Sequence, residues 1–291
     1  MPAIHRRLAP VVGALILAAC ASSAPGNTPA TPGASPSTPP AGNNRAGAGI
    51  LYSAVTRARY RLDSRDSLSM EMPDGSFQRS VTVKATYLTM TFVADPRGLR
   101  ATIVLDSMML DRPNSIIQPL VDSTKGTEWG GVLAPNGRLE SLTANHPSLF
   151  GEQVRTMLNR LIPVLPTGGV EAGRSWTDTS SVPFNLMAGF SGSEQRHAEY
   201  SAGKAEDNHG TRSVPITSAI RYAVSGSGSA MGPEIHMEGS GQAMGTHRLS
   251  MTGRLLEASV NDSVSMTLNV PAAGQTVPAV VIATYSLTIL P

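Results

Sequence analysis

Apolar and polar residues alternate over long stretches of this chain, and a period of two restricts such stretches to β-strands that bury one face. The apolar residues that share a face are Val81, Val83, Ala85 and Tyr87; Leu99, Ala101, Ile103 and Leu105; Val264, Met266, Leu268 and Val270; and Val277, Ala279, Val281, Ala283, Tyr285, Leu287 and Ile289. We expect each set to form the core side of a half-buried strand.

Short turn signals separate these runs. Pro73-Asp74-Gly75, Asp95-Pro96-Arg97-Gly98, Pro135-Asn136-Gly137 and Ala272-Ala273-Gly274 each interrupt the alternation. Gaps this short join antiparallel neighbours and cannot contain the crossover that parallel strands require. The predicted fold is therefore mainly β with a minor helical part (α+β). We expect one domain over residues 50–291, a large, strongly curved antiparallel sheet or half-barrel of about ten strands.

One segment has helical spacing instead. Across residues 148–162, apolar residues recur on one helical stripe, with Ser148 as the predicted N-cap and Pro163 and Pro166 ending the helix. We expect this helix to pack across one face of the sheet, or alternatively to bind a partner. The residues predicted to face solvent are Gln153, Arg155, Asn159 and Arg160.

The amino terminus has the parts of a secretory signal over residues 1–19: a start containing Arg6 and Arg7, and an apolar run from Leu8 to Leu17. The run is roughly half of the ~20 residues that a spanning helix needs. It ends in Leu17-Ala18-Ala19-Cys20, which resembles the lipobox of bacterial lipoproteins. The resemblance implies cleavage before Cys20 and a lipid on that cysteine. The alternative is an ordinary secreted protein in which Cys20 has no such role.

The resemblance also implies a location. The chain would be exported and lipid-anchored in the bacterial cell envelope, and the non-acidic Ala21 favours the outer membrane. Cys20 is the only cysteine, so no intramolecular disulfide can form. Residues 20–49 are almost entirely Ala, Ser, Thr, Pro, Gly and Asn, which predicts a disordered tether. Without Arg6 and Arg7, the 23 basic residues no longer exceed the 21 acidic ones, which argues against nucleic-acid binding.

No catalytic or cofactor-binding residue is predicted. Ser191 has a glycine two residues before it but none two residues after, so it lacks a nucleophile elbow. His236 and Glu238 fall on one strand face, and a metal site with His247 on a neighbouring strand is the one arrangement left open. The segment Gly226–Gly232 returns in similar form as Gly239–Gly245 and is interpreted as two adjacent glycine-rich strand or turn units with local twist or bulging.

Methionine is unusually frequent in or beside the predicted strands. These methionines either fill an ordinary core or line a cavity for acyl chains beneath residues 148–162. They are Met70, Met72, Met90, Met108, Met109, Met231, Met237, Met244, Met251 and Met266.

Two further resemblances bear on function. Leu165-Pro166, Gly169, Gly173 and Ser175-Trp176 follow the helix in an order that resembles β-rich bacterial envelope lipoproteins. The predicted architecture is similar to half-barrel lipid carriers of the LolA and LppX type. The second resemblance is one of architecture alone, and neither supplies an activity. The leading hypothesis is a non-enzymatic lipoprotein whose curved sheet and helix enclose an apolar groove for a lipid or other lipophilic molecule. The alternatives are a structural module of an envelope protein assembly and an enzyme without a local motif.

Overall fold

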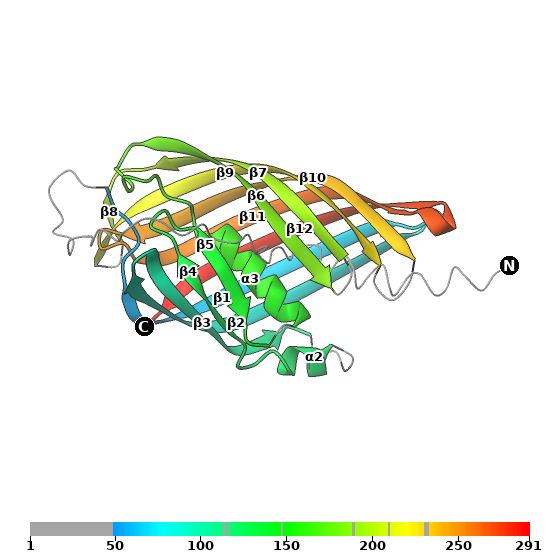
Figure 1. Ribbon diagram of the computed structural model, residues 1–291, viewed down its shortest axis with the longest axis horizontal. Helices are drawn as coiled ribbons and strands as arrows, with labels where there is room; N and C mark the ends of the chain where they lie inside the picture. Colours follow the sequence, from blue (N-terminus) through cyan, green and yellow to red (C-terminus); the bar gives the residue numbers. More distant parts are fainter. Residues whose placement is uncertain are drawn as a thin grey trace, which may run out of the picture.

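The protein is dominated by one curled antiparallel sheet of 12 strands, seen in a computed structural model (Figure 1). The structure describes residues 49–112, 115, 117–146, 148–187, 190–208, 210–229 and 233–291. The expectation of a mainly β, strongly curved antiparallel half-barrel with a helix packed across it is confirmed. The predicted signal peptide, the lipobox and the tether up to residue 48 lie outside the described residues.

The strands are long, and their bounds follow the chain in order. They are β1 (Val55–Glu71), β2 (Phe77–Asp95), β3 (Gly98–Leu110), β4 (Glu128–Leu133), β5 (Leu139–Ala144), β6 (Ser175–Met187), β7 (Phe190–Ala202), β8 (Glu206–Asn208), β9 (Thr211–Ser229), β10 (Glu234–Ser250), β11 (Leu255–Val270) and β12 (Gln275–Leu290). The described helices are α2 (Gln118–Asp122), α3 (Leu149–Leu161) and the single 3-10 turn η1 (Pro271–Ala273).

The strand order places the two ends of the chain in the middle of the sheet. It runs β5-β4-β3-β2-β1-β12-β11-β10-β9-β7-β6, with β8 paired to β9 beside this path. The first and last strands therefore pair with each other, from Arg59 with Leu290 to Met70 with Ala279. The two free edges, β5 and β6, are neighbours in sequence and are joined through α3. The predicted turns lie between strands, and Gly75 and Gly137 have φ values of 78° and 85° that favour glycine.

Helix α3 lies on the concave side of the curled sheet, between the edge strands β5 and β6 (Figure 1). Its predicted N-cap is confirmed, because the Ser148 hydroxyl accepts a hydrogen bond from the Gly151 amide. Val154, Leu158 and Leu161 of α3 are fully buried against the sheet. The helix thus fills the interior of the half-barrel and completes its apolar core.

The alternation in β2 has the opposite orientation from the one expected. Val81 is 46% exposed, and the buried side chains of this strand are Lys84, Thr86, Leu88, Met90 and Phe92. Both faces of β2 carry apolar residues, so the period predicts the strand but does not determine which face is buried. The other predicted apolar sets face the core, Ile289 being only partly buried.

The described part of the glycine repeat, residues 226–229 and 239–245, lies in two neighbouring strands, β9 and β10, whose pairing has no register shift. The expected bulge is therefore absent from this described pair. A Cβ atom on Gly241 would lie 2.3 Å from the Tyr222 ring, and one on Gly226 would lie 3.0 Å from the Phe190 ring. These glycines thus make room for aromatic rings that point into the half-barrel.

Candidate functional site

The polar side of α3 is enclosed by the sheet instead of facing water. Gln153, Arg155 and Arg160 are only 4%, 5% and 7% exposed, and Asn159 is partly buried. The expectation that this side faces solvent was therefore wrong. The sheet curls so far around the helix that the polar side of α3 faces β7, β9 and the gap between the two edge strands, β5 and β6. Polar groups in such a position need partners, because burying an unpaired charge is costly.

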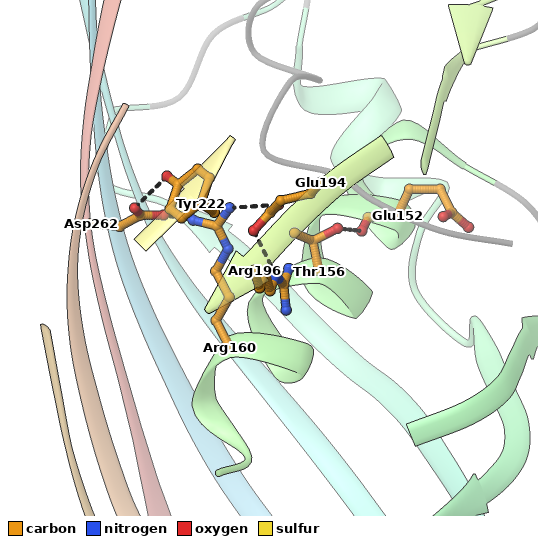
Figure 2. A network of polar contacts seen from close by, with 7 residues as sticks. All are labelled: Glu152, Thr156, Arg160, Glu194, Arg196, Tyr222 and Asp262. Carbon is orange, nitrogen blue, oxygen red and sulfur yellow. Dashed lines mark hydrogen bonds and ion pairs between the residues drawn. The ribbon is translucent and has the colours of Figure 1, made fainter. Parts of the chain in front are cut away.

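Arg160 has those partners in a buried cluster formed with Asp262 of β11, Glu194 of β7 and Tyr222 of β9 (Figure 2). Its guanidinium forms ion pairs with Asp262 and, at 3.2 Å, with Glu194, and lies 4.9 Å from the centre of the Tyr222 ring. The Tyr222 hydroxyl donates a 2.6 Å hydrogen bond to Asp262. We call Arg160, Asp262, Glu194, Tyr222 and Arg196 the interior charge cluster.

Arg196 completes the charge balance of this cluster. Its Nε donates to Glu194 at 2.5 Å, so two guanidinium groups face two carboxylates. Burial acts to raise the pKa of Glu194, but Arg196 and Arg160 outweigh it and lower the pKa below its ordinary value. Glu194 is therefore ionised and held by two guanidinium groups. This arrangement binds the helix to three strands on one side of the half-barrel.

A second ion pair, between β1 and β2, lies under α3 on the other side of the sheet and is hydrogen-bonded to the helix. The Lys84 ammonium group lies 3.1 Å from an Asp66 carboxylate oxygen and donates to the Gln153 amide oxygen at 3.0 Å. It also lies 5.9 Å from the centre of the Phe150 ring. Lys84 and Asp66 come from β2 and β1, so the helix makes polar contacts to both halves of the sheet.

His247 provides a third polar contact between the sheet and the helix. It is buried on the inner face of β10, with Nδ1 3.0 Å from the Leu161 carbonyl and Nε2 3.0 Å from the Ser218 hydroxyl. A neutral ring that donates from Nδ1 and accepts at Nε2 satisfies both contacts. Burial lowers the pKa of His247 to about 4, although the hydrogen bond to the Leu161 carbonyl acts in the opposite direction.

We expect this histidine to make the protein less stable in acid. The unfolded chain takes up the proton near pH 6.5, whereas the folded protein resists it until about pH 4, so the stabilisation is complete above pH 6.5 and is lost as the pH falls. This single group should lower the free energy of unfolding by about 2 kcal/mol between about pH 7.5 and about pH 5. Urea unfolding of the protein and of His247→Gln should show the smaller pH slope in the variant. Equal slopes would contradict the assignment.

The two free edges of the sheet, β5 and β6, face each other across a seam beside α3. The Arg138 guanidinium forms an ion pair with Asp178 across the seam and donates to the Thr179 carbonyl at 3.4 Å. The Trp176 indole donates to the Val164 carbonyl at 2.8 Å and stacks on Tyr200 with 5.3 Å between ring centres. These contacts connect β6 to the turn before β5 and to the segment that follows α3.

A cavity of about 270 Å³ lies at this seam, which we call the seam cavity. Its lining mixes apolar residues, including Leu139, Leu142, Ile162 and Val164, with polar ones, including Arg138, Glu140, Arg155, Asn159, Asp178, Ser180 and Arg196. Arg155, Asn159 and Ile162 contribute the helix side of the cavity. A cavity that offers both apolar and charged groups has the chemistry to hold an amphiphilic molecule.

Most of the strand methionines fill the core. Met70, Met90, Met108, Met237 and Met266 are buried, whereas Met109, Met244 and Met251 are exposed. Met72 is partly buried, and Met231 lies outside the described residues. None of the described methionines lines the seam cavity. A separate cavity of about 20 Å³ touches Met90 and Phe92, a volume of about one water molecule.

The one metal arrangement left open by the sequence does not form. His236 and His247 lie in the same strand, β10, an odd number of positions apart, so they face opposite sides of the sheet. His236 and Glu238 are exposed on the outer face, while His247 is buried. Among the described residues, no group of three His, Cys, Asp or Glu side chains could hold a cation. Ser191 is exposed in β7, and Gly189 lies outside the described residues.

Sequence reasoning missed the interior charge cluster, although a signal was available. Asp262 lies two residues from both Val260 and Val264, on the face that carries the core residues of β11. Glu194 likewise shares a face with Ala198 and Tyr200. A charged residue at a core position of an alternating strand predicts a buried partner of opposite charge.

Comparisons with known proteins leave the chain without an assigned family. No protein-family model matches it, and no curated protein sequence is significantly similar to it. In the described part of the chain, no helix is long and apolar enough to cross a bilayer.

Proposed function

We propose that this protein is a lipoprotein of the bacterial envelope, attached to the membrane through lipid on Cys20, that binds a lipid or another lipophilic molecule within its half-barrel. The motif Leu17-Ala18-Ala19-Cys20 and the small-residue segment after it support the attachment. The observation that carries the binding proposal is the seam cavity, whose lining offers both apolar and charged side chains next to α3.

The shape of the interior supports an amphiphilic ligand. The inner faces of β1, β11 and β12 form an apolar surface that α3 covers. The polar group of an amphiphile would meet Arg138, Arg155 and Arg196 at the seam, and its apolar chain would lie against Leu142 and Ile162. A chain longer than the seam cavity would extend between α3 and the sheet, where it would have to displace packed side chains.

The test is the lipid content of the purified protein. Lipid extraction and native mass spectrometry should detect a bound lipophilic molecule, and Ser180→Trp should reduce its amount at least about fivefold because an indole would fill the seam cavity. Thr177→Trp is the matched control, since Thr177 is exposed on the other face of the same strand. Absence of any bound lipid from the unaltered protein, or equal loss in both variants, would reject the binding proposal.

The second candidate function is a structural module that holds an envelope protein assembly. The interior charge cluster favours it, because paired charges beneath the helix occupy space that an open apolar groove would need. Crosslinking followed by affinity purification would then recover one reproducible protein partner. Recovery of such a partner from a protein without bound lipid would favour the module over the lipid binder.

A further inference from the structure

A row of arginines runs along the outer face of β1. Arg57, Arg59, Arg61 and Arg65 share this face and are exposed, with Asp63 lying between the last two. Arg79 of β2 continues the row beyond Ser67, to whose hydroxyl it donates at 3.4 Å. Successive side chains on one face of a strand are about 7 Å apart. We call Arg57, Arg59, Arg61, Arg65 and Arg79 the arginine stripe.

Few acidic residues neutralise the arginine stripe. Arg61 pairs with Asp63 at 2.9 Å, and these two side chains are about half exposed, which makes the pair weak. Within the part of the chain that the structure describes, no ion pair is found for the other stripe arginines. The stripe therefore carries excess positive charge, although the mature chain as a whole is near neutral.

Exposed apolar residues lie beside the stripe on the same face. Val81 and Ile282 flank Ser67 on the two neighbouring strands and are 46% and 55% exposed, and Val280 lies opposite Ser69. Val81 belongs to the apolar set of β2 that the sequence predicted to face the core, and in the structure this set lies on the outer face of the sheet. An outer sheet face that combines unpaired arginines with exposed aliphatic side chains is typical of a binding surface.

The geometry points to the surface of an anionic lipid bilayer as the partner of this face, and we propose that the arginine stripe docks there. The convex face of a curled sheet meets a flat surface along a line parallel to its strands. The arginine stripe follows such a line along β1, from Arg57 to Arg79, which lies opposite Ser69. Arginines near an anionic leaflet each favour binding, and the adjacent valines and isoleucine can enter the headgroup region. The lipid on Cys20, which is part of the proposed function, would bring this face close to a bilayer but would not itself contact the stripe.

The test separates the stripe from the anchor. The chain over residues 20–291 with Cys20→Ser, which lacks the apolar segment 1–19 and cannot carry the lipid, is mixed with vesicles of phosphatidylcholine alone or with about 30% phosphatidylglycerol, and binding is measured by flotation. We expect binding to the anionic vesicles only. Arg57→Gln/Arg59→Gln/Arg65→Gln should weaken it about a hundredfold. The matched control, Arg174→Gln/Arg212→Gln/Arg221→Gln, removes the same charge from exposed positions on β9 and just before β6, and should retain most of the binding.

Three outcomes would overturn the proposal. They are absence of binding to anionic vesicles, equal binding to both kinds of vesicle, and equal loss in the stripe and control variants. A stripe variant that changes the size of the protein in gel filtration instead would identify a second copy of the chain as the partner and would also reject the bilayer. If Cys20 proves not to carry lipid, the expected binding to anionic vesicles stays the same, because the protein tested has no lipid.

Discussion

Replacing Arg160 by methionine is expected to lower the free energy of unfolding by about 3–5 kcal/mol. The change removes a buried positive charge and leaves two carboxylates, Asp262 and Glu194, with only Arg196 to balance them. The penalty comes mainly from the charge that stays buried without a partner and less from the contact that is lost. Urea or thermal unfolding of the purified protein measures the difference.

A second variant makes this expectation specific to charge. Arg160→Met/Asp262→Asn removes one charge of each sign, so Arg196 and Glu194 remain as a balanced pair, and the new side-chain amide oxygen can still accept the hydrogen bond from Tyr222. We expect the double variant to be more stable than Arg160→Met alone. Arg174→Met, at an exposed pair with Glu171, should change stability by less than about 1 kcal/mol. A double variant less stable than Arg160→Met would show that packing, not charge balance, dominates.

Replacing Cys20 by serine is expected to abolish palmitate labelling of the protein and to make its membrane attachment sensitive to high salt. Serine cannot form the thioether that attaches the lipid. Two or three acyl chains bind firmly, at about 0.8 kcal/mol per buried methylene, so their loss far exceeds any contribution from the protein surface. Metabolic labelling with palmitate followed by fractionation measures both label and location. Ala21→Ser is the control, because it changes the neighbouring residue and preserves the thiol. A labelled Cys20→Ser protein would contradict the anchor.

The strands and turns could be predicted because their signals are local. Alternation over residues 277–289 and turns such as Pro135-Asn136-Gly137 depend on neighbours in sequence and need no knowledge of tertiary contacts. The N-cap of α3 at Ser148 is equally local. The strand order is not local, since nothing in residues 59–70 identifies residues 279–290 as their partner.

The site could not be predicted because its chemistry depends on the degree of curl. Arg155 and Arg160 have the pattern of a solvated helix face, and in a flat sheet they would be solvated. In this protein, β7 and β9 curl over the helix, so the same pattern encloses a charge cluster. His236 and His247 fail as a metal pair for a simpler reason: one long strand holds both, where two short strands were expected.

The pairing of the first strand with the last has a consequence for how the molecule is made. Strand β1 is the first described strand along the chain, yet one of its two hydrogen-bonded neighbours, β12, is the last. Until β12 has docked, β1 exposes an unsatisfied edge of amides and carbonyls, and the chain is open to mispairing and aggregation. Pairings this distant in sequence also form slowly. A chaperone that shields the edge of β1 would therefore be most valuable in the last step of folding, just before the sheet joins along its midline.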